Sequence, residues 1–472
     1  MCKQNIQFTK GQQNAFDQMM KFVESQDSKV YILRGYAGTG KTTLVKSLVK
    51  KLDEKEIEHV LLASTGRAAK ILSNATGCGA STIHSLIYKF TDLSQDLSLL
   101  VDENVEMHDD GQLYLNFDLV PVSDANKIYI IDESSMISDE KDKKDFQAQF
   151  GSGRLLSDLF EYDPNGKFIF IGDACQLPPT SHGESPALSA QYLKKVFDID
   201  AMETELTEVV RQSNDNDIVQ AAHCVRKLYM NPQPWRWAKF PFKGYKNIHV
   251  LNSSAELYSK YLEAVADRNF NDATLISYSN KQCEAVTDII RPALNIHDKT
   301  ISEGDLLLIT QNNYPTGLMN GDQVVVKKIV NRTYRAGMSF VDVEVEELFS
   351  KRVYNQLLLE DILYTNQTNL NAEQHKELYK DFYVRMSKKG IKQKSPLFND
   401  LMLQDPFLNA IKAVFGYSLT CHKSQGGEWQ KVFLDIPRYL PALEKPYVYQ
   451  WIYTAMTRAR QELYVVKDFW LM

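Results

Sequence analysis

The sequence predicts an α/β protein with two parallel-sheet domains and small β insertions. Three observations predict this fold class. Apolar runs of strand length alternate with helical periodicity in the first third of the chain, the same alternation returns after residue 201, and short strands around turns interrupt it twice. Near-continuous apolar strands separated by helices are typical of a parallel sheet buried on both faces. The 472 residues suffice for roughly two to four domains.

In the first third, the predicted strands are short apolar runs that end in polar or glycine residues: 30–33, 60–63, 128–131 and 168–171. Residues 42–52 place their apolar side chains on one helical face. The stretch 88–126 differs, because it is acidic and lacks helical periodicity. It contains Asp109-Asp110-Gly111 between two alternating segments, which is typical of a hairpin. We therefore expect a small β insertion there.

The second α/β set begins near Ala201. Its predicted elements, in chain order, are strand 274–277, helix 281–291, strands 306–309 and 324–326, and strands 432–436 and 463–466. The turn Asn320-Gly321-Asp322 lies between two of the short strands and predicts a small barrel. Residues 350–408 are polar, and their pattern leaves the secondary structure open.

The composition is that of an ordinary globular protein, with 44% hydrophobic and 24% charged residues. The net charge of −6 argues against a protein that coats nucleic acid through bulk positive charge, but it leaves a local basic track open. The six cysteines are scattered without a C-x-x-C pair, which argues against a zinc or redox site. No signal core and no run of about 18 apolar residues occurs. We therefore expect a cytoplasmic protein without membrane contact.

A phosphate-binding loop is predicted at residues 35–42, where Gly-Tyr-Ala-Gly-Thr-Gly-Lys-Thr matches G-x-x-x-x-G-K-[ST]. The match follows a predicted strand and precedes an amphipathic helix. A glycine-rich turn that matched the pattern by chance would not be expected in this position. Its glycines let backbone N–H groups surround phosphates at a helix N-terminus. Lys41 would reach the β- and γ-phosphates, and Thr42 would bind Mg²⁺. The residues of this loop predicted to bind nucleotide are Gly35, Ala37, Gly38, Thr39, Gly40, Lys41, Thr42 and Thr43.

A second nucleotide motif is predicted at Ile128-Tyr129-Ile130-Ile131-Asp132-Glu133, an apolar strand that ends in two acids. Asp132 would hold the Mg²⁺ shell, and Glu133 would orient and deprotonate the attacking water. Alone, such a pair is equally compatible with a strand end followed by a helix cap. Beside the phosphate loop it indicates an NTP hydrolase, whose hydrolysis must drive another process.

Seven further segments follow one another along the chain: Thr9-Lys10-Gly11-Gln12, Ser64-Thr65-Gly66-Arg67-Ala68-Ala69, Ser81-Thr82-Ile83-His84-Ser85, Gly172-Asp173-Ala174-Cys175-Gln176-Leu177-Pro178-Pro179, Leu206-Thr207-Glu208-Val209-Val210-Arg211-Gln212, Thr420-Cys421-His422-Lys423-Ser424-Gln425-Gly426 and Tyr453-Thr454-Ala455-Met456-Thr457-Arg458-Ala459-Arg460. In this order they resemble the motifs of superfamily 1 helicases, and among these the 5′-to-3′ group that includes RecD and phage Dda helicases. Some matches are weak alone, but together they span nearly the whole chain.

The resemblance implies two RecA-like motor domains with small β insertions, namely a pin-bearing hairpin and an SH3-like barrel. The implied divisions are 1–87 and 127–190 for motor domain 1A, 88–126 for insertion 1B, 191–310 and 411–472 for motor domain 2A, and 311–410 for accessory domain 2B. The implied ligands are ATP with Mg²⁺, single-stranded DNA and junctions between single and double strands. The motor is expected to be a monomer.

The resemblance also implies roles for individual residues. The catalytic set is Lys41, Asp132, Glu133, Gln176, Arg211 and Arg458, with Arg460 as a second-choice arginine finger. Gln12 would read the adenine, while Gln425 and Gly426 would add to the nucleotide site. The DNA track would use Thr65, Arg67 and His84 on the first motor domain and Asn280, Thr420 and His422 on the second. A packing role for either histidine and a helix cap at Asn280 are the structural alternatives.

The leading functional hypothesis is an ATP-dependent helicase that moves 5′ to 3′ on single-stranded DNA. A translocase that remodels protein–DNA complexes without unwinding would share every motor motif, and phosphate-directed contacts leave RNA open as the substrate. An ATP-switched binding module conflicts with Glu133. The candidate wedge is the hairpin at 109–111, with an ordinary solvated hairpin as the alternative. Residues 379–394 combine basic and aromatic side chains, which fits either single-strand contact or a solvated helix end.

Overall fold

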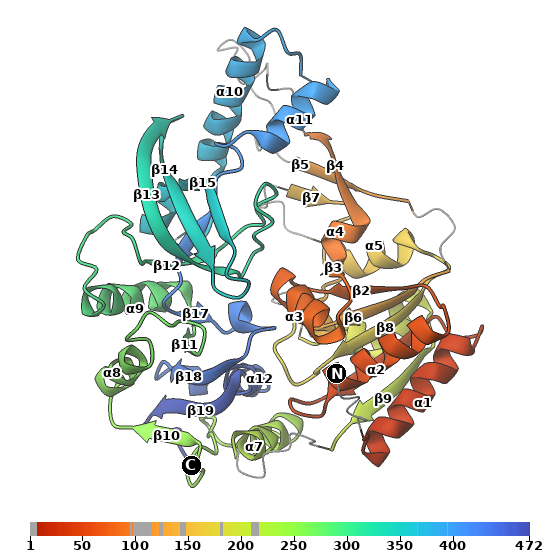
Figure 1. Ribbon diagram of the computed structural model, residues 1–472. Coiled ribbons are helices and arrows are strands. Elements are labelled where there is room, and N and C mark those ends of the chain that lie inside the picture. Colours follow the sequence, from red (N-terminus) through yellow and green to blue (C-terminus); the bar gives the residue numbers. More distant parts are fainter. Residues whose placement is uncertain are drawn as a thin grey trace.

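The computed structural model describes residues 7–94, 97, 115–121, 126–141, 148–179, 183–208, 217–365, 367–393 and 395–472. Two α/β domains lie side by side, and a barrel with a pair of helices lies above them in the view of Figure 1. The chain enters the first domain at its N-terminus and finishes in the second. The fold is therefore the predicted α/β arrangement with two RecA-like domains.

The first domain contains a parallel sheet of six strands in the order β3-β2-β6-β8-β1-β9. Their bounds are β1 (Val30–Gly35), β2 (His59–Ala63), β3 (Ala80–Thr82), β6 (Ile128–Asp132), β8 (Lys167–Gly172) and β9 (Ala201–Leu206). The helices around this sheet are α1 (Lys10–Glu24), α2 (Lys41–Glu54), α3 (Gly66–Thr76), α4 (Ile83–Ile87), α5 (Leu155–Tyr162) and α6 (Ala190–Phe197). On β1, Tyr31 and Leu33 pack with α1 and α2, whereas Val30 and Ile32 pack with α4 to α6. Burial on both faces explains the near-continuous apolar strands.

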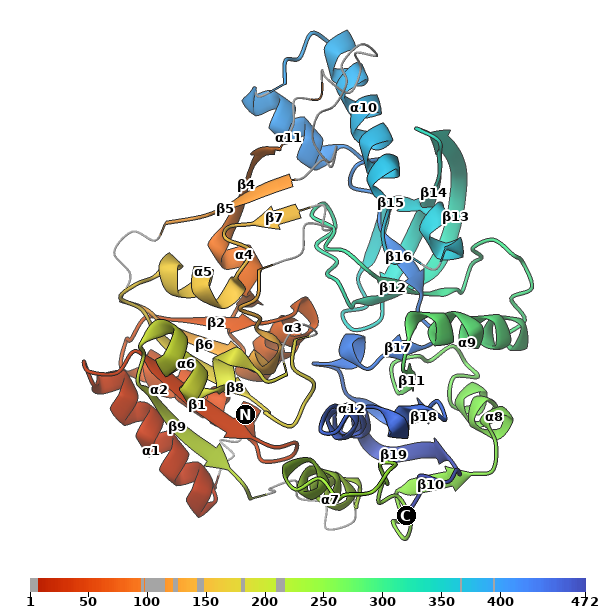
Figure 2. The same ribbon diagram turned by 180° about the vertical axis from the view of Figure 1, so that it is seen from behind.

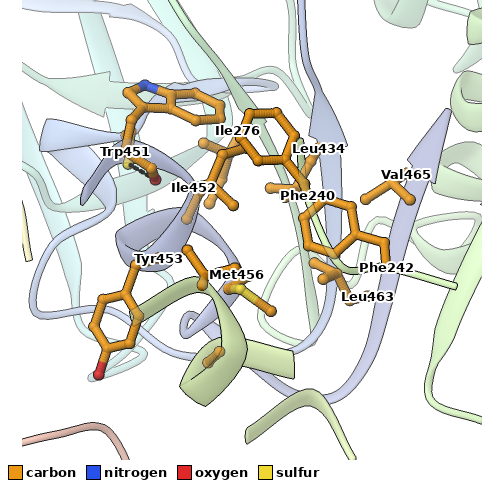
Figure 3. Close-up of a cluster of buried hydrophobic side chains, with 14 of the residues drawn as sticks. Phe240, Phe242, Ile276, Leu434, Trp451, Ile452, Tyr453, Met456, Leu463 and Val465 are labelled. Carbon is orange, nitrogen blue, oxygen red and sulfur yellow. Dashed lines mark hydrogen bonds between the residues drawn. The ribbon is translucent and has the colours of Figure 1, made fainter. Parts of the chain in front are cut away.

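The second domain contains a parallel sheet of five strands in the order β10-β19-β18-β11-β17. Their bounds are β10 (Ile248–Leu251), β11 (Ala273–Ser277), β17 (Leu419–Thr420), β18 (Trp429–Asp435) and β19 (Ala459–Val466). The helices are α7 (Ile218–Met230), α8 (Ser254–Ala264), α9 (Asn280–Ala293) and α12 (Tyr447–Met456). α7 and α12 cover one face of the sheet, and α8 and α9 cover the other. Figure 3 shows the core on the α12 side, where Trp451 and Ile452 lie beside Ile276 of the sheet.

Between the two parts of the second domain lies an antiparallel sheet in the order β15-β14-β13-β12-β16. Its strands are β12 (Leu306–Ile309), β13 (Gln323–Arg335), β14 (Met338–Glu347), β15 (Val353–Leu359) and β16 (Ala413–Phe415). A bridge between Leu358 and Ile411 brings the two edges together, which closes a small barrel. The accompanying helices are α10 (Ala372–Lys388) and α11 (Pro396–Gln404), and Figures 1 and 2 both place α11 next to β4.

The small insertion of the first domain is a three-stranded sheet in the order β4-β5-β7. Its strands are β4 (Tyr88–Leu93), β5 (Leu115–Leu119) and β7 (Ala148–Phe150). Leu93 and Leu115 pack against the cluster formed by α10, α11 and the barrel. The turn at 109–111, which the sequence offers as a wedge, lies outside the described residues. Short 3-10 turns complete the described fold: η2 (Ser134–Met136), η3 (Pro186–Leu188), η4 (Glu360–Tyr364), η5 (His422–Ser424) and η6 (Leu440–Ala442).

Four of the predicted domain boundaries need correction. β9 pairs with β1 along its whole length, so the first domain continues to Leu206 instead of ending at residue 190. β7 adds residues 148–150 to insertion 1B, beyond the predicted 88–126. The barrel sheet uses β12 and β16, so it extends beyond 311–410 on both sides. The polar sequence of β9, Ala-Met-Glu-Thr-Glu-Leu, lacks the apolar run that predicts a buried strand.

The basic and aromatic residues at 379–394 fall largely on α10. Tyr379 and Phe382 are buried in the cluster between α10, α11 and the barrel. Arg385 binds Asp381 and Asp405. These aromatic rings serve packing, which favours the helix interpretation over a stacking surface for single strands. No helix in the described part of the chain is long and apolar enough to cross a membrane.

Candidate active site

The phosphate loop connects β1 to α2, as its pattern requires. Gly38 and Gly40 have φ angles of 81° and 83°, in the left-handed region that favours glycine. A Cβ atom on Gly40 would lie 2.3 Å from Nε2 of Gln12, so a side chain is also excluded by space. The Lys41 ammonium donates to the carbonyl oxygens of Gly35, at 2.7 Å, and Tyr36, at 3.3 Å. The lysine therefore lies on the inner side of the loop.

Gln12 connects the start of α1 to this loop. With Thr9 it forms a capping box, in which the Thr9 N–H donates to Oε1 of Gln12 at 3.1 Å. Nε2 donates to the carbonyl oxygen of Thr39 at 3.0 Å. An amide group has two hydrogens, so one remains beyond the bond to Thr39. Thr39 is fully buried, and its own hydroxyl donates to the Tyr36 carbonyl, which closes the loop from inside.

The two acids lie at the carboxyl end of β6, beside the phosphate loop. Glu133 has a φ angle of 51°, a left-handed conformation that turns the chain sharply after the strand. Its N–H donates to Oδ1 of Asp132 at 2.9 Å. Burial raises the pKa of both carboxyls, the neighbouring Asp132 raises that of Glu133 further, and the Lys41 ammonium opposes both shifts. A buried carboxylate with a raised pKa is suited to accept a proton from water.

One cavity of about 1410 Å³ lies between the two domains. It is lined by residues of the predicted nucleotide and catalytic sets, namely Gln12, Ala37, Gly38, Gly40, Lys41, Thr42, Thr43, Asp132, Glu133, Gln176, Gly426 and Arg458. Arg458 comes from the second domain and is 4% exposed. Its guanidinium donates to the carbonyl oxygens of Thr454, at 3.0 Å, and Gly427, at 3.2 Å. Its positive charge lowers the pKa of Glu133, which places both groups within electrostatic reach.

Comparison with known proteins adds to this geometry. Residues 7–228 match the family model of an AAA domain, and residues 415–466 match that of a UvrD-like helicase C-terminal domain. The chain is 26% identical to the ATP-dependent DNA helicase dda of Enterobacteria phage T4, over 97% of this chain and 99% of the relative. These matches support a helicase of the superfamily 1B type.

A second relative of this helicase is the ATP-dependent RecD2 DNA helicase of Deinococcus radiodurans, which is 23% identical over 92% of this chain and 46% of the relative. A solved structure of two coordinating Pif1 helicases at forked duplex DNA aligns with 98% of this chain and 93% of that chain, with 16% identity and a TM-score of 0.49. The helicase relatives and the AAA domain match identify the chain as an ATP-hydrolysing enzyme.

In the helicase, the segment 172–177 of the first domain reaches into the second. The Leu177 N–H donates to Oγ1 of Thr454 at 2.9 Å, and Nε2 of Gln425 donates to the Leu177 carbonyl at 3.0 Å. Gln176 lines the cavity. The Oε1 atoms of Gln176 and Gln425 are buried and have no hydrogen-bond partner among the described residues. These two acceptors are therefore available to a ligand or to a second arrangement of the domains.

Arg67, a predicted DNA contact, lies at the cavity between the domains, and its role on DNA stays a prediction. Its guanidinium stacks on the ring of Trp429 at 4.3 Å, and both residues line the cavity between the domains. Burial and the nearby Arg458 lower the pKa of Arg67 to about 10, so the side chain remains charged at neutral pH. Its position therefore suits phosphate chemistry in the cleft.

The remaining DNA candidates lie at the ends of strands. Thr65 caps α3 by accepting the Ala68 N–H, and a Cβ on Gly426 would lie 3.6 Å from its hydroxyl. Thr420 ends β17 next to β11, and Asn280 begins α9 shortly after β11. Ser279, and not Asn280, caps α9. Parallel strands end at one edge of a sheet, so this geometry places Asn280 and Thr420 at a common edge.

His422 and Arg211 complete the predicted set. His422 begins the short turn η5 directly after β17, and burial lowers its pKa, which leaves it uncharged at neutral pH. Arg211 lies outside the described residues, so its predicted role as an arginine finger stays a prediction. Arg460, the second-choice finger, forms an ion pair with Glu428 at 2.7 Å.

His84 lies among aromatic rings on α4, at 5.2 Å from the ring of Phe150 and 5.7 Å from that of Tyr88. Burial lowers its pKa to about 4. In the unfolded chain His84 binds a proton once the pH falls below its ordinary pKa of 6.5. In the folded chain it stays neutral down to a pH of about 4. The free energy of unfolding therefore decreases as the pH falls from 6.5 towards 4. Between pH 7 and 5 we expect this residue to contribute a loss of about 1–2 kcal/mol.

Urea unfolding of the wild type and of His84→Phe at both pH values measures this contribution. Other buried histidines titrate in both proteins, so the difference between the two slopes isolates His84. Equal slopes would contradict the assignment of a neutral, packed His84.

A buried ion cluster joins the first domain to the barrel, and no sequence motif indicated it. The Lys70 ammonium of α3 lies 2.6 Å from Oδ2 of Asp322 and 2.6 Å from Oε1 of Glu347. The two carboxylate side chains are only 4% and 2% exposed. Near this cluster, a Cβ atom on Gly66 would lie 2.0 Å from Sδ of Met319. The barrel therefore docks closely on the start of α3.

A second unpredicted contact surrounds the phosphate loop. The Arg226 guanidinium of α7 stacks on the ring of Tyr36 at 3.2 Å. The Tyr36 hydroxyl accepts a hydrogen bond from Arg226 and donates one to Glu205. Tyr36 is in the loop itself, whereas Arg226 lies on α7 of the second domain. Neither pattern nor spacing along the chain reveals such a pairing, because the residues are far apart in sequence.

Proposed function

We propose that this helicase hydrolyses ATP in the cavity between its two motor domains, moves 5′ to 3′ along single-stranded DNA and unwinds duplex DNA. One observation carries the proposal: Lys41, Asp132 and Glu133 of one domain share a cavity with Arg458 of the other. Guanidinium groups bind planar oxygen pairs and stabilise charge that develops on the γ-phosphate. Hydrolysis is thereby coupled to the distance between the domains, which is what a stepping motor requires.

Mg²⁺ is the proposed metal cofactor, and the residues present fit it. Thr42 and Asp132 line the same cavity and offer hydroxyl and carboxylate oxygens. Mg²⁺ prefers such oxygen ligands and usually takes one or two from protein, with the others from phosphates and water. When bound, it would neutralise charge on the β- and γ-phosphates. Lys41 would hold the same phosphates from the loop side, and Glu133 would orient the attacking water.

The proposed DNA track uses the candidates on both domains. Thr65 lies against Gly426, so the first and second domains adjoin beside the track. Asn280 and Thr420 offer uncharged donors at the edge of the second sheet. Hydroxyl and amide groups hold phosphates without reading bases, which suits a motor that ignores sequence. The DNA helicase relatives support DNA over RNA as the substrate.

Strand displacement tests substrate and polarity together. Duplexes of equal sequence carry a 5′ tail, a 3′ tail or no tail, and each is offered with DNA or RNA tails in the presence of ATP and Mg²⁺. Release of the labelled strand is expected only from the 5′-tailed DNA duplex. Unwinding of only the 3′-tailed duplex would contradict the polarity, and preference for RNA tails would contradict the substrate. DNA-stimulated ATP hydrolysis without strand release would identify the alternative translocase.

The proposal includes junctions between single and double strands as binding sites, a monomeric motor and a cytoplasmic location. The scattered cysteines favour that location, since disulfide-rich sequences are typical of oxidising compartments. Sedimentation with a tailed duplex measures the stoichiometry, for which one chain per junction is expected.

A further inference from the structure

Tyr453 lies in the last turns of α12, five residues before Arg458. It is 2% exposed. Figure 3 shows its ring at the margin of the hydrophobic cluster, with the hydroxyl directed away from the other labelled side chains. A buried tyrosine hydroxyl usually finds a partner. Its partners here are across the cleft, in the first motor domain.

Two hydrogen bonds use this single hydroxyl. It accepts the backbone N–H of Ala37, in the phosphate loop, at 3.1 Å. It donates to Oδ2 of Asp173 at 2.7 Å. One phenol oxygen of the second domain therefore connects two segments of the first, the loop that holds phosphates and the segment 172–177. Both bonds require the two domains to be close together.

Asp173 depends on these donors. It is 1% exposed, and its second carboxylate oxygen accepts the Cys175 N–H at 3.0 Å. Burial raises the pKa of Asp173, while the hydrogen bond from Tyr453 favours the charged form. Hydrogen bonds to charged groups are stronger than neutral ones. Loss of the Tyr453 hydroxyl thus leaves both Asp173 and the Ala37 N–H short of a partner in a buried site.

Neighbouring residues of α12 contact the same segment. Thr454 accepts the Leu177 N–H, and Nε2 of Gln450 donates to the Gln176 carbonyl at 3.3 Å. These contacts align α12 with the segment 172–177 of the first domain. Among these α12 contacts, that of Tyr453 is the one that also reaches the phosphate loop.

We propose that Tyr453 is a positioning residue, whose hydroxyl makes ATP turnover depend on the closed arrangement of the two motor domains. The Tyr453 hydroxyl fixes the phosphate loop and the segment 172–177 relative to Arg458. Arg458 follows Tyr453 by five residues in the second domain. The inference rests on the proposed function, because single-stranded DNA that contacts both domains would favour this closed arrangement. DNA-stimulated hydrolysis is then the step that needs the hydroxyl.

The test is Tyr453→Phe, which retains the ring and removes only the hydroxyl. ATP hydrolysis is measured with and without a poly-dT oligonucleotide, and nucleotide binding with a fluorescent ATP analogue. We expect the DNA-stimulated kcat to fall roughly 10-fold or more, since the lost bond involves a charged group. The KM for ATP should change by less than about 2-fold, because the lost contact supports the transition state more than ground-state binding. One nucleotide site per chain should remain.

The matched control is Tyr449→Phe on the same helix. Tyr449 is fully buried and packs on Phe240 within the core of the second domain. This variant removes a buried hydroxyl from α12 without touching the first domain, so its stimulated kcat should equal that of the wild type. An equal fall in both variants would assign the effect to general loosening of α12 and overturn the proposal.

Asp173→Asn tests the same link from its other end, and it also serves if Tyr453→Phe fails to fold. If the pair acts as one unit, the double variant should lose no more kcat than the more impaired single variant. The proposal would be overturned if the loss of kcat in the double variant equalled the product of the two single losses. A wild-type kcat in Asp173→Asn would also overturn it. So would unchanged kcat with a raised KM in Tyr453→Phe. A wild type without DNA stimulation would instead refute the proposed function.

Discussion

Replacing Lys41 by alanine is expected to reduce ATP hydrolysis to background, by on the order of 10³-fold in kcat. The ammonium lies within the phosphate loop, where it donates to the carbonyl oxygens of Gly35 and Tyr36. With ATP bound, it would exchange these acceptors for phosphate oxygens, whose negative charge grows during hydrolysis. A steady-state ATPase assay with single-stranded DNA measures the loss.

Lys46→Ala is the matched control, because Lys46 is exposed on the same helix. This variant should keep wild-type turnover, and circular dichroism should show the same helix content in both variants. Substantial turnover by Lys41→Ala would refute the phosphate-loop assignment, whatever the behaviour of the control.

Replacing Glu133 by glutamine should preserve ATP binding and slow hydrolysis by about 10²–10⁴-fold, the contribution typical of a general base. The side chain keeps its size, so the left-handed turn after β6 is retained. Burial and Asp132 raise the pKa of Glu133 above its ordinary value of 4.5. The wild type should therefore lose activity as the pH falls through that raised pKa, since the protonated acid accepts no proton.

The pH profile of kcat distinguishes this role from simple packing. The acid limb caused by Glu133 should be absent from the residual activity of Glu133→Gln. Glu161→Gln, at an exposed position of the first domain, provides the control and should keep both the rate and the limb. A glutamine variant that hydrolyses ATP at the wild-type rate would remove Glu133 from the mechanism.

The parts of the site that could be predicted from sequence are those encoded by neighbouring residues. The phosphate loop is one continuous turn between a strand and a helix, and Asp132 and Glu133 end a single strand. Such features depend on local chain geometry, so the pattern specifies both the structure and the place of the functional atoms. The buried parallel strands were predictable for the same reason, because burial on two faces leaves a nearly continuous apolar run.

Other features depend on pairing between distant segments, which no local pattern contains. β9 lies at a sheet edge and has three consecutive polar residues, Glu203-Thr204-Glu205, so its membership of the first sheet is evident only from its pairing with β1. Arg67 follows Thr65 in one motif, yet the stacking of its guanidinium on Trp429 of the second domain is evident only from the folded structure. Tyr453 stood in a recognised motif, but its role depends on the position of Ala37, more than 400 residues earlier.

The ion cluster of Lys70 with Asp322 and Glu347 gives the closed form an unusual response to temperature. The chain inserts the barrel into the second domain, yet these charges fasten it to the first. The cost of removing charged groups from water falls on warming, whereas apolar contacts weaken on cooling. Heating therefore favours the ion pairs of Lys70, and cooling weakens the apolar contacts beside them. The barrel should separate from the first domain more readily in the cold than at growth temperature.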